Sequence, residues 1–391
     1  MHGRFSKRGI GTDHPGAIGP PPMSRRPEVD PAGVQGAPAF ADARWFPVDL
    51  NVPRREYAFL PIGAELLDRS VFLDSRIDAP VRESSSVAVD VVAQTALPEA
   101  APLAWLFHTS FCCSTLLARM LHVPPHQVVL KEPLVLRRLS DARHAGWPLD
   151  GLVDPSVRLL SRPWDPCPAV VIKPTHAALN IAVELLDATP CSRGVILTSS
   201  LEDFLISNLK KPPETLAKVP ALAERALQAG SFHARLPSDA LAPPDLLAAV
   251  ALQWAAQREL CTDIATAVGP QRLRILDAAA LLDDMQATAW QCVQWLRVPV
   301  PRTLLVPRVA ESSQRHAKAR AAPYDPGHRA ADARMIRARF GSEIVAVLRW
   351  FDRLVVPAMR ADALVVPEWD DARGTDHAGR AGGAPEGGGK W

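Results

Sequence analysis

The sequence predicts an α/β fold in which helices cover both faces of a central parallel sheet, giving three layers. Between residues 103 and 296, short apolar segments of strand length alternate with segments of helical period. Polar residues follow directly after most of the apolar segments. In a parallel sheet these positions gather at the carboxyl edge, where ligands bind. The same pattern therefore predicts the fold class and a binding site at that edge.

Five strands are expected, and each leads toward a helix further along the chain. In chain order the strands are 103–107, 128–130, 169–172, 194–197 and 273–276. The helices are 114–122, 134–143, 177–187, 202–209 and 278–296. A helical insertion at about 210–267 separates the last two strands; it is broken by prolines up to about residue 244 and then becomes one long helix.

The remaining segments give a domain organisation around this core. Residues 44–98 are expected to form an extended arm packed on the core, with a strand at 87–92. The α/β domain spans 99–368 and closes with a strand at 299–307, a basic loop at 312–325 and a helix at 329–351. Both ends of the chain, 1–43 and 369–391, are rich in glycine, proline and charge and are expected to be disordered.

Composition excludes several classes of protein. The 391 residues carry a net charge of +2, so no polybasic surface indicates nucleic acid or an anionic membrane as a partner. No segment reaches the roughly 20 apolar residues of a membrane span. The six cysteines form no C-x-x-C pair, and the N-terminus lacks the apolar core of a signal peptide. We therefore expect a cytoplasmic protein with reduced thiols.

The segment 103–120 is the first strand, turn and helix, and it carries the strongest signal for ligand binding. Its apolar strand breaks into small and polar residues before the helix begins. This layout presents backbone amides at a helix start to an incoming anion, and hydroxyl side chains add donors. We expect the turn to hold a phosphate or a sulfonate through His108, Cys112, Cys113, Ser114 and Thr115.

Cations and bases are expected at the ends of the neighbouring strands. The chain has only eight lysines, and two of them, Lys131 and Lys173, directly follow apolar strands. Their ammonium groups would take up negative charge on a leaving oxygen, and no metal is required for that role. An acceptor hydroxyl or amine also needs a base, for which Glu132 and His176 are candidates and His108 is a third.

This order of elements, over roughly residues 100–325, resembles the sulfotransferase family of P-loop proteins, which use 3′-phosphoadenosine 5′-phosphosulfate (PAPS). In that family the first turn carries a basic residue, Ser, Gly and two hydroxyl residues. Here the positions read Phe111-Cys112-Cys113-Ser114-Thr115, so the hydroxyl pair matches whereas the basic residue and the glycine do not. Lys173 and His176 look like the family's lysine and histidine after a middle strand, at slightly different spacing.

Two later features extend the resemblance. The family places an arginine after a strand and a serine eight positions later on the 3′-phosphate; here the serine matches Ser207, and the arginine position is Ser199. The basic loop is similar to the family's closing loop, with Arg315 and Lys318. The resemblance implies a P-loop NTPase-like fold in a divergent bacterial member, with PAPS as the donor. It implies sulfonate transfer to a hydroxyl or amine on a small molecule or a side chain.

Other readings of the same residues stay open. A degenerate P-loop protein would bind a nucleotide or a partner without catalysis, and a kinase-like phosphotransferase would use another nucleotide. Cys113 and Arg119 have the C-x5-R spacing of cysteine phosphatases, although the residues between them lack the glycines of a phosphate cradle. A metal site built on His108 and Cys112 would need further ligands that the sequence does not indicate.

Overall fold

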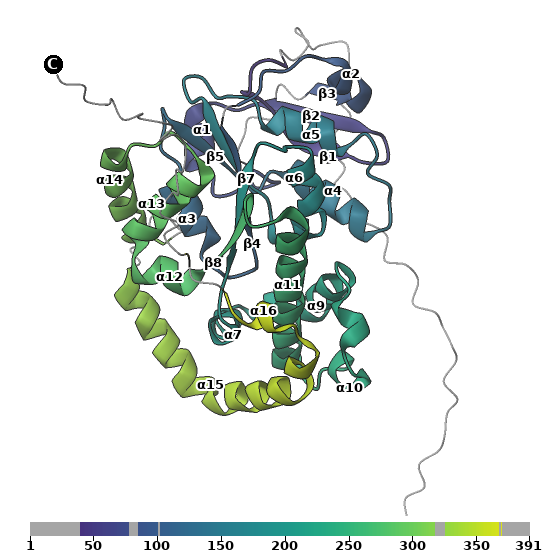
Figure 1. The fold of residues 1–391 in the computed structure, drawn as a ribbon, viewed down its shortest axis with the longest axis vertical. Coiled ribbons are helices and arrows are strands. Elements are labelled where there is room, and N and C mark those ends of the chain that lie inside the picture. Colours follow the sequence, from purple (N-terminus) through teal and green to yellow (C-terminus); the bar gives the residue numbers. More distant parts are fainter. Residues whose placement is uncertain (1–39, 78–84, 101, 317–324, 367–368, 370–391) are drawn as a thin grey trace, which may run out of the picture. The chain divides into compact units, whose positions relative to one another are not determined.

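The computed structural model describes residues 40–77, 85–100, 102–316, 325–366 and Trp369. At its centre lies a five-stranded sheet with the order β5-β6-β4-β7-β8 (Figure 1). Every neighbouring pair of strands is parallel. The predicted α/β fold with a central parallel sheet is therefore confirmed. The strands are β4 (Leu103–His108), β5 (Gln127–Lys131), β6 (Ala169–Lys173), β7 (Arg193–Thr198) and β8 (Leu273–Asp277).

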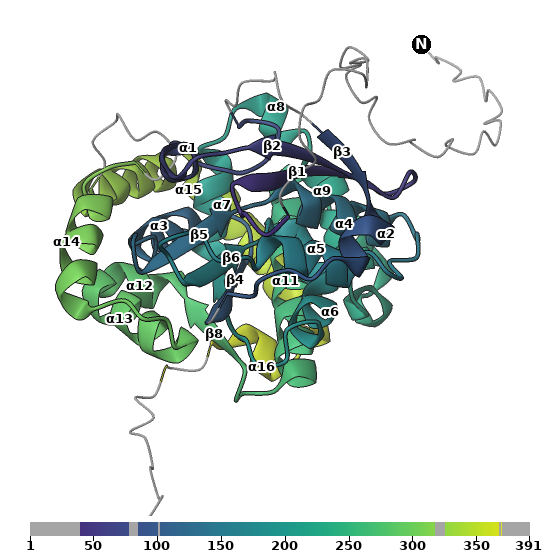
Figure 2. The same ribbon diagram turned by 90° about the horizontal axis from the view of Figure 1, so that it is seen from above.

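Helices cover both faces of this sheet because alternate strand residues point to opposite sides. Along β4, Leu106 joins one hydrophobic cluster, whereas Trp105 and Phe107 join another. The first cluster is covered by α3 (Ser114–Met120), α12 (Ala278–Asp283), α13 (Met285–Leu296) and α14 (Arg302–Ser313). The second is covered by α4 (Leu134–His144), α5 (Val153–Leu160), α6 (Ala182–Asp187) and α11 (Leu246–Val268). Figure 2 shows the two groups on opposite sides of the strands.

The segment before the sheet forms a second, antiparallel sheet of three strands, ordered β1-β2-β3. Its elements are β1 (Trp45–Asn51), β2 (Glu56–Pro61), α1 (Ala64–Arg69), β3 (Ser85–Ala88) and α2 (Val89–Gln94). The expected strand at 87–92 is wrong beyond Ala88, where α2 begins. The reason is the spacing of Val89 and Val92, which buries both side chains on one face of a helical turn.

Buried polar contacts fix this second sheet to the core. Arg162 is 1% exposed, and its guanidinium donates hydrogen bonds to the carbonyls of Phe40, Asp42 and Trp45. The hydroxyl of Tyr57 lies 2.7 Å from that of Ser156 on α5. The antiparallel sheet is thereby held on the same side of the core as α4 and α5.

The C-terminal third of the core differs from the sequence prediction in one element. The strand expected at 299–307 is instead the start of α14, which begins at Arg302 after Pro301. Leu305, Val309 and Ser312 are buried at helical spacing on one face of this helix, and that burial decides its conformation. The expected helix at 278–296 is divided into α12 and α13 at Asp284, which caps α13.

The remaining helices after β7 lie at one end of the fold. They are α7 (Leu201–Leu209), α8 (Pro213–Leu216), α9 (Val219–Gln228), η4 (Phe232–Arg235), α10 (Ser238–Leu241), α15 (Pro326–Leu354), η5 (Val356–Ala358) and α16 (Ala361–Leu364). Residues of α7, α11 and α15 share a third hydrophobic cluster. Figure 1 shows α15 bending along this end, with its kink at Phe340. The start of α15 therefore returns to the region of α7.

Some predictions fall on residues outside the described ranges. These are the terminal segments 1–39 and 370–391, and Lys318 in the basic loop. Across the part of the chain that is described, none of the helices combines the length and apolar character needed to cross a bilayer.

Candidate functional site

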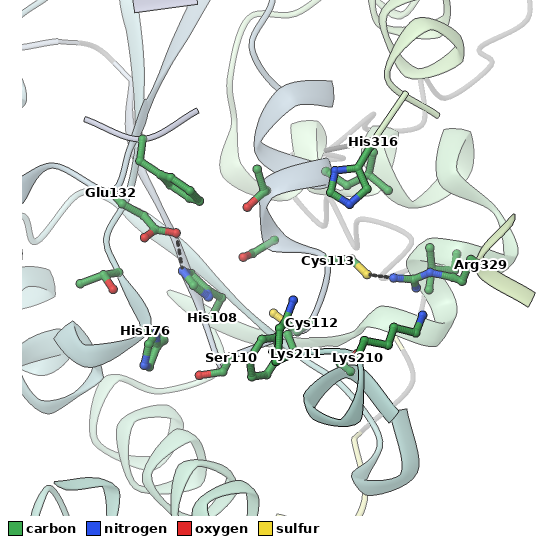
Figure 3. Close-up of a pocket in the computed structure, with 18 of the residues that line it drawn as sticks. His108, Ser110, Cys112, Cys113, Glu132, His176, Lys210, Lys211, His316 and Arg329 are labelled. Atoms are coloured by element: carbon green, nitrogen blue, oxygen red, sulfur yellow. Dashed lines mark hydrogen bonds and ion pairs between the residues drawn. The ribbon is translucent and has the colours of Figure 1, made fainter. Parts of the chain in front are cut away.

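A cavity of about 750 Å³ lies at the carboxyl ends of β4, β5 and β6. It is lined by strand-end residues, by the turn before α3, and by residues of α7, α14 and α15. Figure 3 shows Glu132, His108 and His176 together at one end, and Cys113, Arg329 and His316 at the other. The polar segments that follow three separate strands in the sequence therefore meet in one place, as a parallel sheet requires.

The turn between β4 and α3 adopts a conformation that usually requires glycine. Phe111 and Cys113 have φ angles of 57° and 65°, each costing about 1–2 kcal/mol for a residue with a Cβ. Contacts at the start of the turn hold it in place: the N–H of Thr109 donates to the carbonyl of Leu197, and that of Ser110 donates to Gln257 Oε1. These contacts keep the turn compact although neither position is a glycine.

The first turn of α3 presents its polar groups to the cavity. The amides of Leu116 and Leu117 both donate to the carbonyl of Cys113, so the helix begins at Ser114. The amides of Ser114 and Thr115 precede the first intrahelical bond and have no acceptor within the helix. His108, Cys112, Cys113, Ser114 and Thr115, which the sequence analysis selected, all line the cavity.

Lys173, Glu132 and His108 form a buried network at the other end of the cavity. Lys173 Nζ lies 2.5 Å from Glu132 Oε1 and 3.0 Å from His108 Nε2. Lys173 is 1% exposed, and it lies behind Glu132 and His108, outside the set of residues that line the cavity. Its ammonium therefore contacts Glu132 and His108, which do line the cavity, and its expected role as a cation for the ligand stays a prediction.

The network fixes the charges of its members. Burial and the charge of Lys173 lower the pKa of His108 to about 3. Its Nδ1 donates to the carbonyl of Thr109, so the neutral ring accepts from Lys173 at Nε2. Burial raises the pKa of Glu132, but the charge of Lys173 outweighs it and lowers that pKa to about 2. At neutral pH the network is an ammonium, a carboxylate and a neutral imidazole.

His176 is the cavity's second imidazole and lies outside this network. It begins the 3₁₀ helix η3 (His176–Ile181) after β6 and is partly exposed in the cavity. Its ring centroid is 6.3 Å from that of His108. Burial lowers its pKa to about 4, against the opposing charge of Glu132. At neutral pH His176 is therefore an uncharged base that faces the cavity.

Two further residues selected from the sequence, Lys131 and Ser199, are not among those that line the cavity. Lys131 is 2% exposed, and its ammonium donates to the carbonyls of Leu67 and Asp68 at 2.9 and 3.1 Å. This ammonium binds carbonyls near the end of α1 and is not among the residues that line the cavity, where the sequence analysis expected a catalytic cation. Ser199 is 3% exposed, and its carbonyl accepts from Trp254 Nε1 on α11. Ser199 is therefore buried and lies outside the set of residues that line the cavity.

Basic side chains from three helical regions line the end of the cavity nearest Cys113. Arg315 and Ser207, both selected from the sequence, are among the lining residues. Sequence reasoning missed Lys210, Lys211 and Arg329, which also line it. A signal for the two lysines was available: Lys210 and Lys211 are two of only eight lysines, and they stand side by side directly after a predicted helix. Arg329 carried no such signal, because it is the first residue of the helix predicted at 329–351 and no local pattern links it to the turn.

These cations are held by specific partners. Lys210 Nζ lies 3.2 Å from Asp332, and Arg329 Nη2 lies 2.7 Å from Cys113 Sγ. Burial raises the pKa of the Cys113 thiol even though Arg329 opposes the shift. Arg119 is buried and donates to the carbonyl of His316. A phosphatase site would need a thiolate beside Arg119, so the C-x5-R reading is not supported.

The cavity is more basic than acidic. Six basic side chains face four acidic ones around it; they are Arg76, Arg137, Lys210, Lys211, Arg315 and Arg329 against Asp74, Glu132, Asp325 and Asp332. Among the described residues, no three His, Cys, Asp or Glu side chains are grouped as metal ligands. The cavity is suited to an anion with more than one negative charge.

Comparison with known proteins gives matches to solved structures alone. No protein-family model matches the chain, and no curated protein matches it. A sulfotransferase domain from the curacin biosynthetic pathway is 13% identical with a TM-score of 0.33, over 63% of this chain and 99% of that one. A sulfotransferase from Alicyclobacillus acidocaldarius is 16% identical with a TM-score of 0.34, over 68% and 100%. A sulfotransferase domain of the Synechococcus PCC 7002 olefin synthase is 12% identical with a TM-score of 0.34, over 61% and 88%.

Proposed function

We propose that this protein is a sulfotransferase-like enzyme that transfers a sulfonate from PAPS to a hydroxyl or amine acceptor. One observation carries the proposal: a single cavity joins an amide-lined turn, a set of cations and an uncharged histidine. Such a cavity has one end suited to a multiply charged donor and another suited to proton removal. The resemblance in the order of the elements agrees with this division.

The donor lies against the turn and the basic end. The amide and hydroxyl of Thr115 and those of Ser114, which also contact the Cys112 thiol, face the phosphosulfate from the first turn of α3. Lys210, Lys211 and Arg329 surround the same region and offset the charge of the two phosphates. As the bond between sulfur and the bridging oxygen breaks, negative charge grows on the phosphate that leaves. Groups already positioned for that charge lower the barrier to transfer.

His176 is the base that takes the acceptor's proton. Glu132 is less suited, because its ion pair with Lys173 lowers its pKa to about 2. His108 uses both ring nitrogens within the buried network. His176 is neutral at pH 7 and lines the cavity. The acceptor oxygen or nitrogen bonds to sulfur, its proton passes to His176, and 3′-phosphoadenosine 5′-phosphate departs with the electrons of the broken bond.

Calorimetry tests the donor directly. We expect wild-type protein to bind 3′-phosphoadenosine 5′-phosphate, and to bind AMP at least about tenfold more weakly because one phosphate is missing. Since the chain has no G-x-x-x-x-G-K-[ST] motif, ATP with magnesium should bind weakly. Tight, magnesium-dependent binding of ATP would favour a phosphotransferase. Absence of binding by the bisphosphate at millimolar concentration would refute the proposal.

A variant separates binding from transfer. His176→Ala should bind the bisphosphate as wild type does, because the imidazole lies at the acceptor end of the cavity. Transfer of labelled sulfonate to a panel of alcohols and amines should fall by about a hundredfold or more, the usual contribution of a general base. Unchanged transfer in this variant would assign the base to Glu132.

A further inference from the structure

Lys211 lies over the aromatic ring of Phe111 at the turn. Its Nζ is 5.2 Å from the ring centroid, within the range of a cation–π interaction. Both residues line the cavity, and Figure 3 shows the side chain of Lys211 extending toward the turn beside Cys112. The ammonium therefore stands over the turn although it comes from the end of α7.

The ring of Phe111 is itself held in position. It packs edge-on against Phe204 of α7, with centroids 5.5 Å apart, and Phe204 is fully buried. Because φ at Phe111 is 57°, the side chain leaves the turn in a direction that an ordinary backbone conformation would not give. The buried Phe204 and the left-handed backbone thus fix the ring, and the ring fixes where Lys211 stands.

We propose that Phe111 and Lys211 together replace a basic residue of the turn, with Lys211 contacting the anion bound there. This inference rests on the proposed function in taking that anion to be the phosphosulfate end of PAPS. The turn has no basic side chain between Thr109 and Thr115, so its charge has to come from another element. The ring of Phe111 positions the ammonium, and Lys211 provides the positive charge.

The test is calorimetry with 3′-phosphoadenosine 5′-phosphate and, as a second probe, inorganic pyrophosphate. Lys211→Met keeps an unbranched stem on the ring and removes the charge. We expect binding of both probes to weaken roughly tenfold to a hundredfold, as for loss of one hydrogen bond to a charged group. Lys218→Met is the matched control, because Lys218 is exposed and outside the cavity, and it should bind as wild type does.

A relocation variant distinguishes charge from structure. In Phe111→Lys/Lys211→Met the charge moves onto the turn, and we expect most of the lost affinity to return. If Lys211→Met binds as Lys218→Met does, or if relocation restores nothing, the inference is wrong. Urea unfolding of each variant shows that loss of binding is not loss of folding.

The two probes separate this inference from the proposed function. Wild type that binds pyrophosphate but not the adenosine bisphosphate, with loss in Lys211→Met, would sustain the role of Lys211 and remove PAPS as donor. Wild type that binds both, with no change in Lys211→Met, would leave the donor in place and refute the inference. A protein that binds neither probe refutes both.

Discussion

The two ends of the cavity are built in different ways. At one end, Lys173, Glu132 and His108 come from three neighbouring strand ends and bond to one another below the surface. At the other, Lys210 and Arg329 come from helical regions far apart in the sequence, and each has a separate partner. The first end is one connected network, whereas the second is a set of separate side chains arranged around the cavity.

This difference has a consequence for stability and binding. Strand ends are fixed by the sheet; the N–H of Glu132, for example, donates to the carbonyl of Lys173 at 2.6 Å. A buried charge there cannot be removed without leaving its partner unpaired. Charges at the basic end are partly exposed, so mutating them changes the free energy of unfolding only a little. We therefore expect mutations at the network to lower stability, and mutations at the basic end to lower affinity.

Lys173→Met is the change with the largest expected effect. It leaves the Glu132 carboxylate, which is only 15% exposed, without its ammonium partner, and breaking a buried pair costs up to about 3–5 kcal/mol of unfolding free energy. Urea unfolding measures this loss. The double variant Glu132→Gln/Lys173→Met should lose less than the single one, because no unpaired charge remains. Equal losses in the two variants would mean that the pair does not hold this end together.

The pH dependence of stability gives the next effect. The pKa of His108 is about 3 in the folded protein against about 6.5 when unfolded. Between these values the unfolded state binds a proton that the folded state does not, so stability falls as pH is lowered below 6.5. His108 should contribute a slope of up to about 1.4 kcal/mol per pH unit. His176, with its pKa lowered to about 4, contributes in the same direction.

His108→Gln isolates this contribution. Glutamine can still accept from Lys173 and donate to the carbonyl of Thr109, but it does not titrate. Urea unfolding between pH 4.5 and 6.5 should show the slope reduced by about one proton. Glu132 does not add to the slope in this window. Its pKa is lowered from 4.5 to about 2 on folding, so its contribution to stability decreases only below about pH 4.5. An unchanged slope would show that His108 is already protonated when folded.

The network end was the more predictable from sequence because local patterns specify it. Continuous apolar runs define strands, and the residues after them must share one edge of a parallel sheet. Lys173, Glu132, His108 and His176 were found in this way. Strand position does not tell how each lysine is used: Lys131 pairs in register with Lys173, yet it bonds to carbonyls of α1, whereas Lys173 bonds to Glu132 and His108.

The basic end was less predictable because tertiary packing assembles it. Arg329 reaches Cys113 from a position 216 residues away, and no local pattern encodes that distance. The segment 299–307 shows the same limit, since a short run with prolines at its ends fits a strand until burial of Leu305 and Val309 selects a helix. In this segment packing decides the conformation, so the local sequence pattern predicted a strand where a helix forms.

Ser207→Ala is the smallest change and tests the basic end most cleanly. Ser207 is partly buried on α7 and lines the cavity, so its hydroxyl is available to a phosphate of the donor. Loss of one hydrogen bond costs about 1 kcal/mol, or about fivefold in the dissociation constant of the adenosine bisphosphate. Alanine is the better helix former, so stability should stay the same or rise by a few tenths of a kcal/mol. Ser342→Ala, on α15 and outside the cavity, provides the control. A loss of stability in Ser207→Ala, with affinity unchanged, would place this serine with the structural end of the cavity and remove the contrast.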